Sequence, residues 1–211
     1  NKIIETGKPV IIVMLEGRPR VITEIEPKAK GVLLGFLPGM EGGDAIADVL
    51  FGDVNPSGKL PITYPKTPNG ITLYDYKPIE KYDGNDYNPL WPFGYGLSYT
   101  TFEYSNLKIS SQEITENEEL TVKVDVKNTG NTDGKEVVQL YLTDKYGSVT
   151  RPNKQLKAFE KVMLKSGEVK TVEFKINKQQ LSFIGQDNKR IVEPGDFVVT
   201  IQNHTANFEL K

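Results

Sequence analysis

The chain has 211 residues, enough for one large domain or two small ones with separate hydrophobic cores. Its 26 Lys and Arg residues nearly balance 28 Asp and Glu residues, so a net charge of −2 favours neither nucleic acid nor anionic lipid as a partner. Cysteine is absent, which excludes disulfides, thiolate zinc sites and cysteine nucleophiles without choosing a compartment. No apolar run approaches the roughly 18 residues that a membrane-spanning helix needs.

The first part of the chain predicts parallel β-structure. Continuous apolar runs at residues 9–15 and 31–36 are typical of strands that are covered on both faces. Residues 19–28 between them are enough for a short helix, and its apolar members recur at helical spacing: Val21, Ile22 and Ile25. A strand, a crossover and a second strand predict a parallel βαβ unit. Two strands make a poor sheet, so we expect partner strands upstream and a chain that begins inside a domain.

A glycine-rich turn follows the second run, at the end of a predicted strand where ligands collect in open α/β sheets. Gly42 and Gly43 would let the backbone approach a neighbour closely, and a helix beginning near Asp44 would direct free N–H groups the same way. Glu41 is then either a polar contact at a cleft or, like Asp44, a helix cap. Helix-capping acids are common, so we favour the cap and keep Glu41 as the one candidate substrate-binding residue.

Residues 66–100 are predicted to form a long ordered connector, rich in Pro, Gly, Asn, Asp and Tyr. It contains eight aromatic residues: Tyr74, Tyr76, Tyr82, Tyr87, Trp91, Phe93, Tyr95 and Tyr99. Such rings suit the C–H faces of sugars, but they also suit interfaces between domains. We favour the interface for most of them. The glycines at 52–58 and 94–96 lack the spacing of phosphate-binding and dinucleotide-binding loops.

From about Phe102 onward, the apolar pattern has a period of two. The alternating runs are residues 120–126, 138–142, 172–176 and 197–201. Turn residues separate these runs, for example at 128–130 and 194–195. The pattern predicts an antiparallel β-sandwich of immunoglobulin or fibronectin type III character. His204, the only histidine, excludes a Ser–His or multi-His metal site in this chain and fits a strand residue at the solvent edge.

Two strings, residues 38–65 and 92–104, closely resemble the C-terminal region of family 3 glycoside hydrolases, the β-glucosidase and β-xylosidase group. Residues 128–130, 136–141 and 151–159 add matches, and the last is similar to the family's RP-x-K-x-L-K-x-F segment. The resemblance covers essentially the whole chain.

The resemblance implies a complete enzyme of three domains: a (β/α)₈-type barrel, an α/β sandwich and a fibronectin type III-like domain. This chain would supply the C-terminal part of the α/β sandwich at 1–65, the connector at 66–100 and the fibronectin type III-like domain at 101–211. The implied partners are the N-terminal barrel of the same enzyme and a carbohydrate substrate, with no nucleic acid and no membrane. A homo-oligomer stays open.

The resemblance also implies retaining hydrolysis. A barrel aspartate attacks the anomeric carbon, and a glutamate of the α/β sandwich protonates the leaving oxygen and then activates water. Both carboxylates are expected upstream of this chain, and Glu41 matches a later block of the family pattern. We therefore expect no catalytic residue, no cofactor and no metal here. A non-catalytic stabilising or carbohydrate-binding module is the alternative, but such a module would not begin with half of an α/β domain.

Overall fold

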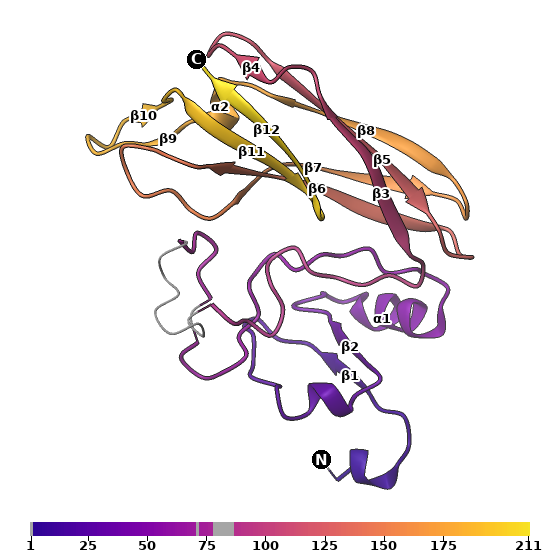
Figure 1. Ribbon diagram of the computed structural model, residues 1–211. Helices are drawn as coiled ribbons and strands as arrows, with labels where there is room; N and C mark the ends of the chain where they lie inside the picture. Colours follow the sequence, from indigo (N-terminus) through magenta and orange to yellow (C-terminus); the bar gives the residue numbers. More distant parts are fainter. Residues whose placement is uncertain (1, 71, 78–86) are drawn as a thin grey trace. The chain divides into compact units, whose positions relative to one another are not determined.

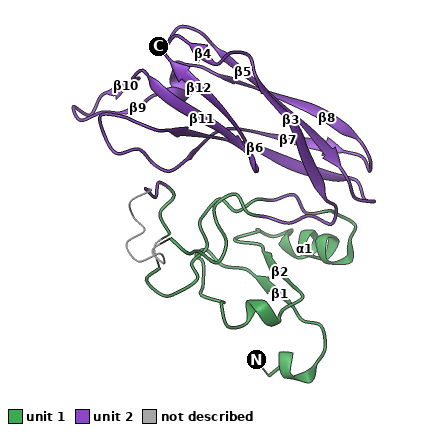
Figure 2. Ribbon diagram, viewed as in Figure 1, with its two compact units in different colours: residues 1–55, 59–74, 81–95 green, residues 56–58, 75–80, 96–211 purple. Residues whose placement is uncertain are grey.

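The computed structural model describes residues 2–70, 72–77 and 87–211 (Figure 1). The described residues form two compact units (Figure 2). Unit 1 takes its residues from 1–55, 59–74 and 81–95, and unit 2 takes its residues from 56–58, 75–80 and 96–211. Within the described ranges, every helix is too short or too polar to cross a membrane.

Unit 1 is built on two parallel strands. β1 (Ile11–Met14) and β2 (Gly31–Leu34) pair in parallel along their whole length, as the two apolar runs predict. A 3₁₀ helix, η1 (Ile4–Thr6), precedes β1, and the helix α1 (Gly42–Phe51) follows β2. Gly52 ends α1 with a φ of 91°, and its N–H donates to two carbonyls of the last turn.

The short helix predicted for residues 19–28 is wrong. That stretch forms turns, and its only helical part is the 3₁₀ helix η2 (Glu26–Lys28). Pro27 gives the reason, because in an α-helix over residues 19–28 it would lie in the interior, where it lacks the N–H for a helical hydrogen bond, whereas it is tolerated in the first turn of η2. Of the three apolar residues at helical spacing, Ile22 is buried, Ile25 is partly buried and Val21 is 45% exposed, so the spacing indicated neither the backbone conformation nor a common buried face.

A small core joins the strands of unit 1 to two distant segments. Its buried members are Ile22, Leu60 and Tyr64, and the partly buried members are Met14, Ile25, Val32, Leu34, Phe36, Ile62, Leu90 and Trp91. Tyr64 and Trp91 form an isolated antiparallel bridge, and Leu60 N donates to the Tyr95 carbonyl at 2.8 Å. The end of the connector therefore lies beside residues 60–64.

Unit 2 is a β-sandwich (Figure 1). One sheet has the order β4-β12-β11-β6-β7 and the other has the order β3-β5-β8. The strands are β3 (Phe102–Ile109), β4 (Glu113–Ile114), β5 (Leu120–Asn128), β6 (Gly134–Asp144), β7 (Gln155–Leu164), β8 (Val169–Ile176), β11 (Gly195–Ile201) and β12 (His204–Leu210). The pairs are antiparallel except for the short parallel pair of β4 and β12. A helix, α2 (Lys178–Leu181), and the hairpin of β9 (Phe183–Ile184) and β10 (Arg190–Ile191) complete the unit.

Alternating side chains build the core of the sandwich, as the period of two predicts. In β5, every second residue from Leu120 to Val126 is fully buried, while the residues between them are partly or fully exposed. The inward-facing residues of β6, β8, β11 and β12 alternate in the same way and fill the space between the sheets. The fold class predicted from the sequence, parallel α/β followed by an antiparallel fibronectin type III-like sandwich, is confirmed.

Candidate functional site

The carboxyl ends of β1 and β2 form one edge of the parallel pair, and a loop leaves each strand there. We call residues 15–20 the first edge loop and residues 35–41 the second edge loop. The two loops are in contact, because a Cβ built on Gly17 would lie 3.8 Å from Leu37 Cδ1. Parallel strands present ligand sites at this edge, so the two loops are the part of unit 1 best placed to line a cleft.

Glu41 occupies the N-cap position of α1, at the end of the second edge loop. Its side chain is exposed and makes no capping hydrogen bond to the helix. Asp44 lies in the first turn, where a carboxylate interacts favourably with the helix dipole. The helix begins at Gly42, two residues before the expected start, and the capping position predicted for Glu41 is found without the capping hydrogen bond. A role for Glu41 in substrate binding stays a prediction.

The two glycines that follow Glu41 have different surroundings. Gly42 is buried, and a Cβ there would lie 2.5 Å from Pro38 Cγ, well inside van der Waals contact. A Cβ on Gly43 would have no described neighbour within 4 Å. The close approach predicted for both glycines is therefore required only at Gly42, where it allows the second edge loop to fold against the first turn of α1.

A tyrosine from a distant segment holds the first edge loop. The Tyr64 hydroxyl lies 2.9 Å from the Arg20 carbonyl oxygen and 3.1 Å from Glu16 Oε1, either of which accepts its proton. It also accepts a 3.3 Å hydrogen bond from Arg20 N. Glu16 Oε2 forms an ion pair with Arg20 Nε at 3.3 Å, and the Glu16 side chain is only 10% exposed. We call Glu16, Arg20 and Tyr64 the Tyr64 cluster.

Electrostatics keep the Tyr64 hydroxyl protonated. Burial and the nearby negative charge of Glu16 raise the pKa of Tyr64 to about 12, while the hydrogen bond that the hydroxyl accepts from the Arg20 amide opposes the increase. The hydroxyl therefore remains a donor at neutral pH. The sequence did not indicate this cluster, because the partners of Tyr64 are 44 and 48 residues away along the chain.

The aromatic residues of the connector mostly contact other protein groups. In unit 1, the Trp91 ring lies 5.1 Å from the Tyr64 ring and stacks on Tyr95 at 6.1 Å, and Tyr74 meets Phe93 edge to face at 4.8 Å. In unit 2, the Tyr76 hydroxyl accepts a 2.7 Å hydrogen bond from Asn153 Nδ2. Tyr82 lies outside the described residues. These contacts favour a structural role over a sugar-binding one.

The segment that resembles RP-x-K-x-L-K-x-F lies beside a hollow in unit 2. Arg151 Nε pairs with Asp144 Oδ2 at 2.9 Å, and its guanidinium carbon lies 3.9 Å from the centre of the Phe183 ring. Burial raises the pKa of Asp144 even though Arg151 lowers it, and burial lowers the pKa of Lys157, which also lines the hollow. The hollow is therefore lined by groups of both charges, and Arg151 is paired with Asp144, which favours a structural role for this ion pair.

His204 lies partly exposed on β12, and its Nε2 is 2.9 Å from the Tyr104 carbonyl oxygen, which fits the strand position predicted for it. Across the ranges that the structure describes, no group of three or more His, Cys, Asp and Glu residues is placed to hold a metal ion.

Two family models match the chain: the glycosyl hydrolase family 3 C-terminal domain at residues 1–99 and the fibronectin type III-like domain at residues 136–205. A periplasmic β-glucosidase of Salmonella typhimurium is 45% identical over 93% of this chain and 28% of its own length. A β-xylosidase of Formosa agariphila is 43% identical over 98% of this chain and 30% of its own length.

Solved structures agree with these matches. A β-glucosidase of Erythrobacter marinus has a TM-score of 0.92 at 38% identity, covering 99% of this chain and 29% of that one. A β-glucosidase of Listeria innocua, solved with isofagomine, has a TM-score of 0.88 at 36% identity, covering 99% of this chain and 32% of that one. The chain thus spans about 30% of the length of the relatives it matches. It belongs to glycosyl hydrolase family 3, as the C-terminal domain followed by the fibronectin type III-like domain.

Proposed function

We propose that this chain is the C-terminal part of a retaining, exo-acting β-glycosidase, a β-glucosidase in the first instance, that releases terminal β-D-glycosyl residues from oligosaccharides or glycosides. The similarity to β-glucosidases over nearly the whole chain carries this proposal. It extends through both family models in the same order, so it is more than a likeness of fibronectin type III-like modules.

The chemistry of this proposal lies outside the chain. Retaining hydrolysis needs two carboxyl groups about 5–5.5 Å apart on either side of the scissile bond. At the carboxyl edge of β1 and β2, both oxygens of Glu16 are already engaged, one by Tyr64 and the other by Arg20. Glu41 is exposed at a helix end. We assign neither residue a catalytic role, and Glu41 contributes at most a polar contact to the wall of the cleft.

The partner of unit 1, in this proposal, is the N-terminal portion of the same enzyme, with its (β/α)₈ barrel. Alternate residues of β1 and the residue that follows the strand form an exposed apolar face. Their exposed fractions are 53% for Ile11, 39% for Val13 and 58% for Leu15. Strands of a parallel sheet are normally covered on both faces. The exposed apolar face of β1 therefore needs a partner, and the chain spans only 30% of the length of a relative that it matches. Both observations support the rest of the enzyme as the part that packs on this face. The division of the chain at residues 65 and 100 stays a prediction.

The test uses the complete enzyme, meaning this chain together with the portion that precedes it. The purified protein is assayed on p-nitrophenyl β-D-glucoside and β-D-xyloside, and proton NMR follows the anomer that is released first. We expect hydrolysis with the β anomer appearing first, and a Glu41→Gln variant with an unchanged kcat. Absence of turnover on both substrates, or first release of the α anomer, would contradict the proposal.

A further inference from the structure

The first edge loop depends on one side chain from outside it. Within 3.3 Å, the Tyr64 hydroxyl meets the carbonyl and amide of Arg20 and the carboxylate of Glu16. These groups lie at the two ends of the turn that contains Gly17, Arg18 and Pro19. The same two ends are joined by the ion pair between Glu16 Oε2 and Arg20 Nε, which uses the carboxylate oxygen that does not face Tyr64. One hydroxyl therefore fixes both ends of the loop.

Tyr64 is itself held rigidly. Its side chain is 1% exposed, and its backbone donates to the Trp91 carbonyl at 2.8 Å and accepts from Leu90 N at 2.9 Å. The Trp91 ring covers it at 5.1 Å. Rotation of the Tyr64 side chain would break the ring contact and remove the hydroxyl from its polar partners, which costs more than a hydrogen bond contributes. Through Tyr64, the packed core of unit 1 thus fixes the position of the first edge loop.

The loop held in this way lies at the carboxyl edge of the parallel pair, the edge at which open α/β sheets bind ligands. Gly17 and Arg18 are exposed, and Leu37 of the second edge loop lies beside Gly17. A shift of the first edge loop would therefore change the shape of the whole edge. Displacements of about 1 Å in groups that contact a substrate are enough to change enzyme kinetics by one to two orders of magnitude.

We propose that Tyr64 is a positioning residue for substrate binding, acting through Glu16 and Arg20 to place the first edge loop against the bound glycoside. This inference rests on the proposed function. In this proposal the loop contributes uniform binding, meaning a contact of equal strength in the ground state and in the transition state, and no reacting group is assigned to it. Loss of such uniform binding raises KM and leaves kcat unchanged.

The decisive variant is Tyr64→Phe in the complete enzyme, which removes only the hydroxyl. We expect KM for p-nitrophenyl β-D-glucoside to rise about tenfold, with kcat within about twofold of the parent. Glu16→Gln keeps an acceptor for Tyr64 but loses the charge that pairs with Arg20, so its KM should lie between those of Tyr64→Phe and the parent. The matched control is Tyr104→Phe, which removes a buried tyrosine hydroxyl from unit 2.

A second measurement follows the loop directly. The Arg20 amide donates to the Tyr64 hydroxyl, so its hydrogen–deuterium exchange should be faster in Tyr64→Phe and unchanged in Tyr104→Phe. An unchanged KM in Tyr64→Phe, or an equal rise in Tyr104→Phe, would overturn the positioning role while an active parent left the proposed function standing. A parent that hydrolyses no β-glycoside would overturn both.

Discussion

The Tyr104 hydroxyl donates a 2.9 Å hydrogen bond to Glu136 Oε1 between the two sheets of the sandwich. Tyr104 is on β3, Glu136 is on β6, and both side chains are buried. Tyr104→Phe would leave the buried carboxylate without this donor, so we expect the free energy of unfolding to fall by about 1–3 kcal/mol. Urea unfolding measures the change.

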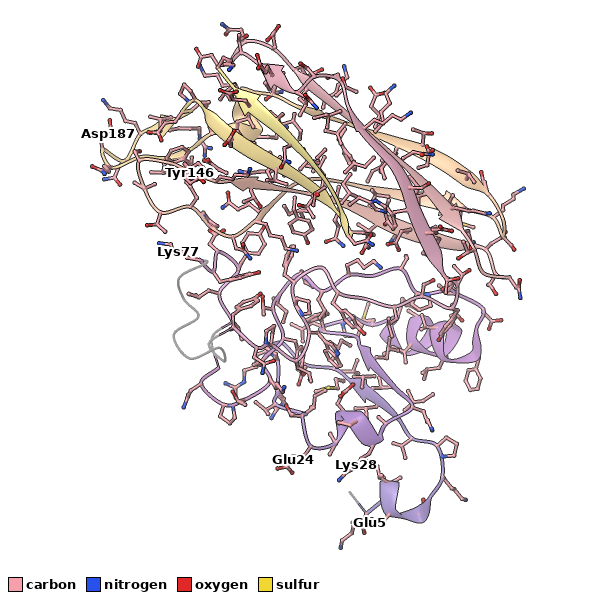
Figure 3. All side chains as sticks on the ribbon, viewed as in Figure 1. Glu5, Glu24, Lys28, Lys77, Tyr146 and Asp187 are labelled. Atoms are coloured by element: carbon pink, nitrogen blue, oxygen red, sulfur yellow. The ribbon has the colours of Figure 1, made fainter. Side chains whose placement is uncertain are left out.

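Tyr146→Phe provides the control for this substitution. Tyr146, which is labelled in Figure 3, is 72% exposed, so the same change should alter stability by no more than about 0.5 kcal/mol. If the two variants were equally stable, the bond between Tyr104 and Glu136 would contribute nothing measurable.

Stability should also fall in alkaline solution. Burial raises the pKa of Tyr64 to about 12, and burial with the adjacent Glu136 carboxylate raises the pKa of Tyr104 as well. A tyrosine in the unfolded chain has a pKa near 10. The bound protons therefore stabilise the folded state fully below about pH 10, and this contribution is lost as the pH rises through the folded pKa values.

The measurement is the urea midpoint at a series of pH values between about 8 and 11, for the parent and for Tyr64→Phe/Tyr104→Phe. The double variant lacks both groups, so its midpoint should decline less steeply above about pH 10. Parallel curves for the two proteins would show that other groups, such as lysines, govern alkaline unfolding.

The paired glycines before α1 allow a matched test of close packing. Gly42→Ala places a Cβ 2.5 Å from Pro38 Cγ, so we expect a loss of about 1–3 kcal/mol in unfolding free energy. Gly43→Ala meets no described atom within 4 Å and should instead stabilise the protein by about 0.4–1 kcal/mol, because alanine favours the helix and restricts the unfolded chain. Thermal unfolding of both variants checks the signs, and a stabilising Gly42→Ala would contradict the predicted crowding.

Removing one partner of the ion pair between Arg151 and Asp144 should lower the free energy of unfolding more than replacing both partners with apolar residues. The two side chains are 11% and 9% exposed, so Arg151→Met leaves a buried carboxylate unpaired and should cost about 3–5 kcal/mol. Adding Asp144→Leu removes that charge, and we expect the double variant to be more stable than Arg151→Met alone. A double-mutant cycle by urea unfolding measures the coupling, and simple additivity of the two substitutions would count against it.

The sequence predicted what depends on local pattern. The alternation from Leu120 to Val126 predicted β5, because one face of that strand is buried and the side-chain period of a strand is two. The apolar runs at 9–15 and 31–36 predicted β1 and β2 and their parallel pairing. The helix at 19–28 failed because proline overrode the helical spacing of the apolar residues.

The candidate site was less predictable, since its contacts join residues far apart in the chain. Nothing near Tyr64 in the sequence indicates that its hydroxyl meets Glu16. Glu41, which the sequence offers as a helix cap or a substrate contact, makes no capping hydrogen bond. The period of two reports which residues of a strand such as β5 are buried, but it does not report which polar groups meet. The resemblance identified the family, and only the structure identified the Tyr64 cluster.

The most direct test of the central claim is the turnover of p-nitrophenyl β-D-glucoside by the purified 211-residue chain, compared with the complete enzyme at equal concentration. We expect hydrolysis by the complete enzyme and none above the buffer rate by the chain alone, because neither catalytic carboxylate is assigned to it. Substantial turnover by the isolated chain would contradict this assignment and place the reacting carboxylates within residues 1–211.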